Sequence, residues 1–210
     1  MLPKSETRSV AGPAGALQCA IDLPGAPPRG VAVLCHPHPL HGGTMDNKVV
    51  MTLARAFVQL GCISVRFNFR GVGSSAGRWD EGRGEVDDAL AVIAALREPG
   101  LPLLLGGFSF GGYVAAQAAS QLAKADAEAA HARRLVLVAP STRHFAMPAV
   151  PADTLVVHGE SDDVVPLAAV LDWARAQTLP ITVVPGAGHF FHGQLTLLKQ
   201  IVLSAFQAAA

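Results

Sequence analysis

Short apolar runs alternate with longer amphipathic runs from residue 30 onward. Most of the short runs are continuously apolar, which is typical of parallel strands that are covered on both faces of a sheet. They predict strands over residues 30–36, 62–69, 101–108, 134–140, 153–159 and 181–186. An earlier pair of extended segments, around residues 15–23, is expected to add an antiparallel edge.

The longer runs repeat apolar residues at helical spacing. In residues 46–61, Val49, Leu53 and Phe57 share one stripe, and Gly61 is a plausible stop at the C-terminal end. Residues 84–98 show the same period, and further helices are predicted over 111–130, 166–177 and 193–208. Alternating strands and helices predict an α/β fold with a doubly wound, mostly parallel sheet and helices on both faces.

The 210 residues are expected to form a single domain over 1–210, with 1–14 as a loosely ordered N-terminal segment. Half of the residues are apolar, 15% are charged and the mean hydropathy is +0.36, as in a well-buried globular protein. Residues 101–123 carry no charge, but Pro102 and four glycines interrupt them. A buried strand, a glycine turn and a helix explain this segment better than a membrane span.

Charge and cysteine content indicate which binding partners and which cellular compartment to expect. Lysine and arginine together number 16, as do aspartate and glutamate, so the formal net charge is zero and no nucleic-acid partner is expected. Cys19, Cys35 and Cys62 are odd in number and share no C-x-x-C spacing, which favours reduced, buried thiols. No apolar signal segment is seen near the N-terminus, and a cytoplasmic location is expected. The sequence makes no prediction of the oligomeric state.

The strongest chemical signal is G-x-S-x-G at residues 107–111, where a buried strand runs into a helix rich in small residues. In that context the motif places Ser109 on a sharp turn, exposed at the carboxyl end of a strand and near a helix N-terminus. The flanking glycines are needed because a sharp turn leaves no space for side chains beside the serine. Ser109 is therefore the candidate nucleophile.

A serine nucleophile needs a base and an orienting carboxylate. Loops after later predicted strands supply both: Asp162 follows the strand at 153–159, and His189 follows the strand at 181–186. The order Ser…Asp…His is that of the hydrolase fold. Alternatives remain at both positions, and they are Asp163, Glu160 and Asp172 for the acid and His192 for the base.

Five motifs in order carry a resemblance: HPHPLHGGTMDNKVV, RFNFRGVGSSAG, GFSFGG, HGESDDVVP and GAGHFF. Over about residues 15–206 the chain resembles small cap-less bacterial α/β-hydrolases near the dienelactone-hydrolase-like group. The family pattern HG-x-x-D-x-x-V-P favours Asp162 as the acid, and the position after Gly-Ala-Gly favours His189 as the base. Dienelactone hydrolases have a cysteine where this chain has Ser109, so their particular chemistry is not expected here.

Three histidines in HPHPLHGG, His36, His38 and His41, suggest a metal site, but no second cluster of ligands is left to complete one. We expect no metal and no cofactor. The resemblance instead makes the His38 backbone N–H an oxyanion donor together with that of Phe110. Pro37 and Pro39 have no N–H to offer. His36 is expected to brace the loop by side-chain hydrogen bonds, and the role of His41 stays open.

A second motif that could suggest a different function is GVGSSAG at residues 71–77, which resembles a dinucleotide-binding loop. The following RWDEGRG cannot open the closely packed helix that a pyrophosphate requires, so a tight structural loop is expected. Arg70 and Asp80 are expected to form ion pairs or to brace this loop, and a role at the rim of the site is the alternative.

These features predict a carboxylesterase-like serine hydrolase that cleaves small or short-acyl esters through an acyl-enzyme. Only about fourteen residues, 140–153, separate two strands where many hydrolases insert a cap, so an open site is expected. Candidate apolar walls, some of which are expected to fill the core instead, are Phe108, Phe110, Trp79, Phe145, Met147, Phe190 and Phe191. The alternatives are thioesterase, lactonase, peptidase or perhydrolase activity on the same triad, and a non-catalytic binding protein.

Overall fold

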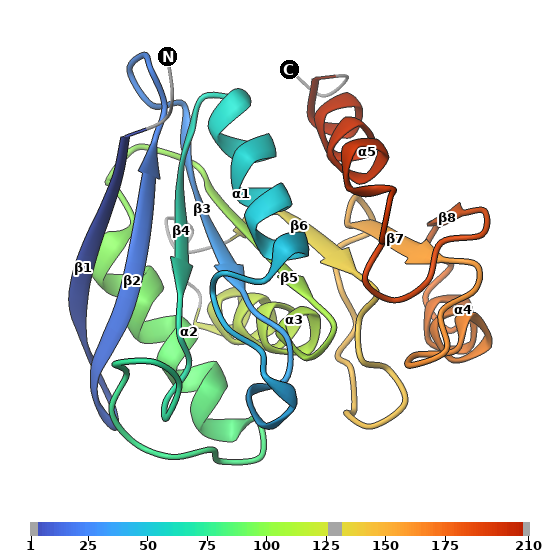
Figure 1. Ribbon diagram of the computed structural model, residues 1–210, viewed down its shortest axis with the longest axis horizontal. Helices are drawn as coiled ribbons and strands as arrows, with labels where there is room; N and C mark the ends of the chain where they lie inside the picture. The colour runs from blue at the N-terminus through green and yellow to red at the C-terminus, as the bar shows by residue number, and fades with distance from the viewer. Residues whose placement is uncertain (1–3, 126–131, 208–210) are drawn as a thin grey trace.

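A computed structural model describes residues 4–125 and 132–207. In these residues eight strands form one sheet in the order β1-β2-β4-β3-β5-β6-β7-β8 (Figure 1). Strands β3 to β8 run parallel, whereas β1 and β2 are antiparallel to their neighbours. Their bounds are β1 Lys4–Gly12, β2 Gly15–Leu23, β3 Gly30–Cys35, β4 Cys62–Phe67, β5 Leu103–Phe108, β6 Ala132–Val138, β7 Leu155–Gly159 and β8 Ile181–Val184.

The antiparallel edge differs from the prediction. Residues 1–14 were expected to be loosely ordered, but β1 pairs with β2 along its whole length, from Lys4 opposite Leu23 to Gly12 opposite Gly15. The apolar pattern does not reveal this strand because most of its residues are polar, as is common at a sheet edge. Backbone hydrogen bonds to β2 hold the strand in place, and its Val10 is buried in the core.

Helices cover both faces of the sheet (Figure 1). One apolar cluster joins the sheet to α1 and α5, and a second joins it to α2, α3 and α4. Their bounds are α1 Lys48–Gln59, α2 Arg83–Leu96, α3 Phe110–Lys124, α4 Leu167–Arg175 and α5 Leu195–Gln207. The predicted helices at 46–61, 84–98, 166–177 and 193–208 are confirmed to within a few residues. Residues 126–130 of the predicted helix 111–130, and residue 208, lie outside the described residues.

The strand order determines where a site can form. Strand β5 lies between β3 and β6. From β3 the chain continues to β4 on one side, and from β5 onward the strands are added on the other side, so the order of strands reverses between β3 and β5. In such sheets the crevice for ligands opens at the carboxyl ends of the strands near this reversal. The loops after β3, β5, β6, β7 and β8 therefore meet at one edge, and these loops carry the predicted chemistry.

No cap covers that edge in the segment between β6 and β7, since residues 139–154 contain neither helix nor strand. The uncharged stretch 101–123 is divided between β5 and α3, as the sequence predicted. Within the described chain, no helix has the length and apolar character needed to cross a membrane.

Candidate active site

Ser109 forms the turn between β5 and α3 in a conformation that residues with a side chain rarely adopt, with φ 55° and ψ −118°. The flanking glycines are a steric requirement. A Cβ at Gly107 would lie 2.0 Å from the Gly111 carbonyl oxygen, and a Cβ at Gly111 would lie 2.2 Å from that of Cys35. The turn is held in place because the Ser109 N–H donates to Val138 O at 2.9 Å and Ser109 O accepts the Ser141 N–H at 3.1 Å.

The loops after β7 and β8 bring a carboxylate and an imidazole together. His189 Nδ1 lies 2.7 Å from Asp162 Oδ2, and both side chains are almost fully buried. Asp162 Oδ1 also accepts the N–H groups of Val164 at 3.0 Å and of Val165 at 2.7 Å. Since a carboxylate only accepts, Nδ1 of His189 carries the proton, which leaves Nε2 as the nitrogen able to accept one.

Two opposing effects act on the Asp162 carboxyl. Burial by itself raises its pKa, but the hydrogen bonds from His189 and Val165 outweigh burial and hold the pKa below its ordinary value. The carboxylate therefore stays ionised, as it must to orient an imidazole and to stabilise its protonated form.

His158 at the end of β7 is a further residue of this site, and sequence reasoning missed it. Its Nε2–H donates to Val165 O at 2.9 Å and lies 3.5 Å from Asp162 Oδ2. Its side chain is fully buried and, among the described residues, its Nδ1 has no hydrogen-bond partner. Burial lowers the pKa of His158, which keeps the imidazole neutral. The sequence did show a histidine directly before the Gly159 turn that leads to Asp162, and this was the available signal.

The residues that the sequence left as alternatives for the acid and the base have different partners or are exposed. Glu160 accepts the Gly186 N–H at 2.9 Å, Asp172 pairs with Arg175 on the exposed face of α4, and Asp163 is exposed. His192 is exposed beside Phe190, with ring centroids 5.8 Å apart. Among the described residues, none of these side chains forms a hydrogen bond or an ion pair with Asp162 or His189.

A pocket of about 350 Å³ opens beside Ser109. Its lining comes from four loops at the carboxyl edge of the sheet and consists of His38, His41, Ser109, Phe110, Ser141, His144, Phe145, Val164 and Val165. Because the N–H groups of Val164 and Val165 bind Asp162, the wall of this pocket is continuous with the Asp162–His189 pair.

The loop HPHPLHGG is held mainly by its backbone and by His36. His36 is fully buried, its Nδ1 lies 2.7 Å from Pro37 O, and its Nε2 accepts the Phe69 N–H at 3.1 Å. It thereby ties the end of β3 to the end of β4, which is the expected bracing role. The carbonyl of His38 accepts the N–H groups of His41 and Gly43, whereas the His38 N–H has no acceptor among the described residues.

The described residues contain no group of three His, Cys, Asp or Glu side chains that could hold a metal ion. The loop at 71–77 leads into no helix before α2 begins at Arg83. Arg70 forms a buried ion pair with Asp88 at 2.8 Å, and Asp80 accepts the Gly84 N–H at 3.1 Å in the first turn of α2. Both residues thus brace the structure, as the sequence predicted.

The residues predicted to form apolar walls fall into three groups: those at the pocket, one that is exposed, and those that belong to the core. Phe110 and Phe145 line the pocket, and Trp79 packs against His38 with ring centroids 4.5 Å apart. Phe190 is exposed and does not line it. Phe108 was expected as a wall, but it is fully buried, because its side chain points into the core shared with α1 and α5. Its ring packs against that of His189, with ring centroids 4.8 Å apart. The remaining candidates are Phe191, which is fully buried, and Met147, which packs against the core.

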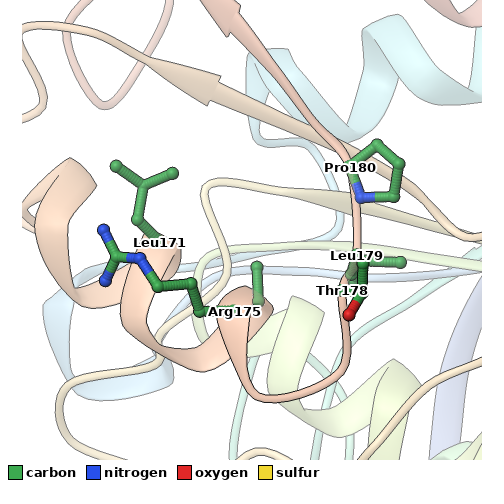
Figure 2. A pocket seen from close by; sticks show the side chains of 6 residues that line it. Leu171, Arg175, Thr178, Leu179 and Pro180 are labelled. Carbon is green, nitrogen blue, oxygen red and sulfur yellow. The ribbon is translucent and has the colours of Figure 1, made fainter.

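A second hollow, of about 430 Å³, lies between α4 and the segment leading to β8. Figure 2 shows Leu171 and Arg175 projecting from the helix and Pro180 facing them from the other side. Its lining contains the hydroxyl of Thr178 but no carboxylate or imidazole that could activate it, so it offers no candidate catalytic pair.

With this geometry in view, the chain belongs to the Hydrolase_4 family, described as serine aminopeptidase, S33, whose sequence profile matches residues 26–152. The protein is an α/β-hydrolase of the serine hydrolase type, without a sizeable cap.

Individual known proteins are also similar to this chain in sequence or in structure. XC6422 from Xanthomonas campestris, described as an α/β serine hydrolase without a lid, is 39% identical, with a TM-score of 0.87 over 98% of this chain and 94% of that chain. An uncharacterized protein of Rickettsia prowazekii is 31% identical over 86% of this chain and 79% of that protein. Dienelactone hydrolase from Anabaena variabilis shares the fold, with a TM-score of 0.74 at 17% identity over 99% of each chain. The predicted resemblance to cap-less hydrolases is therefore confirmed.

Proposed function

We propose that this protein hydrolyses small or short-acyl esters through an acyl-enzyme on Ser109. The single observation that carries the proposal is the buried Asp162–His189 hydrogen bond of 2.7 Å beside a pocket lined by Ser109. A strained serine turn at a helix N-terminus and an oriented imidazole are the parts that nucleophilic acyl transfer requires.

In the first step, His189 Nε2 takes the Ser109 proton while the hydroxyl oxygen attacks the ester carbonyl. Asp162 holds the imidazole and stabilises its positive charge. The imidazolium then gives its proton to the leaving alcohol, and the acyl group stays on Ser109. In the second step, water loses a proton to His189 and attacks the acyl-enzyme, which releases the acid and restores the serine.

The tetrahedral intermediates need donors for their oxyanion. The Phe110 N–H belongs to the first turn of α3, where helical N–H groups have no acceptor within the helix. The His38 N–H likewise has no acceptor among the described residues and lies in a loop that also lines the pocket. We assign the two backbone N–H groups to the oxyanion hole.

Small substrates are favoured by the size of the pocket. Its volume of about 350 Å³ is near the lower end of the range for ligand sites, and no cap lies in residues 139–154. The aromatic side chains of Phe110 and Phe145 supply apolar contact for a short acyl group.

The test is hydrolysis of p-nitrophenyl acetate and butyrate, together with labelling by a fluorophosphonate probe. Ser109→Ala should lower kcat/KM by roughly 10⁴-fold or more and abolish labelling, since the nucleophile is gone. Ser120→Ala, a serine further along α3, serves as the matched control and should retain activity and labelling. Turnover retained by a folded Ser109→Ala protein would overturn the proposal, and a folded wild-type protein that is not labelled would favour the binding-protein alternative.

A peptidase is the second candidate, because the family description names a serine aminopeptidase. The same triad cleaves amides when the leaving amine is protonated in place. Aminoacyl p-nitroanilides assayed beside the p-nitrophenyl esters separate the two candidates. We expect the esters to have the higher kcat/KM, and thioesters and lactones in the same panel test the remaining acyl substrates.

A further inference from the structure

The titratable side chains that line the pocket beside Ser109 are all imidazoles. His38, His41 and His144 are among the nine lining residues, and no carboxylate is among them. The whole chain has eight histidines and a formal net charge of zero, so this concentration is a local feature. Protonation can therefore give the pocket lining a positive charge but never a negative one.

These imidazoles flank the nucleophile. Ser109 follows β5, and the two strands hydrogen-bonded to β5 are β3 and β6. His38 and His41 lie in the loop after β3, and His144 lies in the loop after β6. A ligand attached to Ser109 would thus meet an imidazole from either neighbouring loop.

Charge on these groups is coupled. The rings of His38 and His41 stack with centroids 4.4 Å apart and an angle of 21° between their planes. Burial lowers the pKa of His38, and repulsion from protonated His41 and His144 lowers it further. An anion bound between the imidazoles would offset this repulsion, because it attracts each protonated ring.

His38 can also donate without becoming charged. The Leu40 N–H lies 3.2 Å from His38 Nδ1 and donates to it, so the proton of the neutral ring is on Nε2. The carboxylate next to the pocket wall offers little competition, because the Asp162 side chain is fully buried and paired with His189.

We propose that this pocket selects esters whose acyl group carries a terminal carboxylate, with His41 and His144 as specificity-determining residues. The acyl group is specified because it is the part of the substrate that stays on Ser109 through both steps, and Ser109 lines the pocket. This inference rests on the proposed esterase function and names the substrate class for the same site.

The test compares three p-nitrophenyl esters of similar length at low ionic strength: the adipate half-ester, its methyl-capped neutral counterpart and ε-aminocaproate. We expect kcat/KM for the carboxylate ester to exceed that of the neutral ester by roughly three- to tenfold, and the ammonium ester to fall below both. High salt should bring the three values together, because it screens charges that are partly exposed.

The double variant His41→Gln/His144→Gln should lose most of the preference for carboxylate over neutral ester. His192→Gln removes an exposed histidine outside the pocket lining and should keep the ratio of the wild type. A wild-type ratio of one or less, or a ratio unchanged in the folded double variant, would overturn the inference while the esterase function stands. If none of the three esters is hydrolysed and the probe does not label Ser109, the proposed function itself fails.

Discussion

Nδ1 of His189 lies 2.7 Å from Oδ2 of Asp162, and the other oxygen of this carboxylate is held by the N–H groups of Val164 and Val165. The two residues come from loops after different strands, 27 positions apart in the chain. The sheet brings them together, since β7 and β8 are parallel neighbours and their carboxyl ends meet at one edge.

Asp162→Asn should lower kcat/KM for a p-nitrophenyl ester by about 10⁴-fold, because an amide no longer selects the tautomer of His189 or stabilises its positive charge. Asp163→Asn changes the neighbouring, exposed carboxylate and is the matched control, with an expected change below about twofold. Steady-state kinetics with both variants decide the assignment, and an equal loss in the two would argue against Asp162.

His158→Leu should lower kcat/KM by about tenfold and shift its acid limb to higher pH. A carboxylate that loses a nearby N–H donor is less stabilised in its ionised form, so the pKa of Asp162 rises and the carboxylate stops orienting His189 at a higher pH than in the wild type. His158→Gln, which keeps an N–H donor, should restore part of the shift. A pH–rate profile measures it, and a variant that loses activity with no movement of the limb would assign His158 a structural role only.

Ser109→Gly should stabilise the fold while removing activity. The backbone at Ser109, with φ 55° and ψ −118°, costs about 1–3 kcal/mol for a residue with a Cβ, and glycine relieves much of that cost. Since 1 kcal/mol raises Tm by about 2–4 °C in a chain of this size, a thermal melt resolves the change. Ser109→Ala keeps the Cβ and should show no such gain, so equal Tm values for the two variants would refute the strain argument.

His36 should make the fold sensitive to mild acid. Burial lowers its pKa from 6.5 to about 4, whereas the unfolded chain takes up the proton near 6.5. The unfolded state therefore binds more protons between these values, and stability falls as pH drops from about 6.5 toward 4, by about 3 kcal/mol. Urea unfolding at pH 7 and pH 4 should show a smaller loss in His36→Gln than in the wild type, and equal losses would contradict the prediction.

Much of this architecture could be predicted from pattern alone. Continuous apolar runs located β3 to β8, and the helical spacing of Val49, Leu53 and Phe57 located α1. The glycines around Ser109 predicted the turn, since only residues without a Cβ fit beside Gly111 O and Cys35 O. These features are local, and local chemistry is what a sequence displays directly.

The structure departs from the predictions where a residue's conformation or role depends on a segment that is distant in the sequence. The polar strand β1 exists because β2 offers it a backbone partner, and no apolar pattern records that. The direction of Phe108 depends on which face of β5 it occupies, and a run apolar on both faces does not reveal it. In the sequence, His158 is only a histidine next to a glycine. Its position beside Val165 O and Asp162 is seen only in the folded structure.

The sequence by itself thus determined the class of fold, the serine turn and the order of the candidate groups, because spacing and residue type suffice for these. The tertiary structure decided which carboxylate faces His189, which aromatic rings line the pocket and which histidines surround Ser109. Those outcomes depend on contacts between segments far apart in the chain, and the order of strands in the sheet creates them. His38, His41 and His144 belong to one pocket only because β3 and β6 lie on either side of β5.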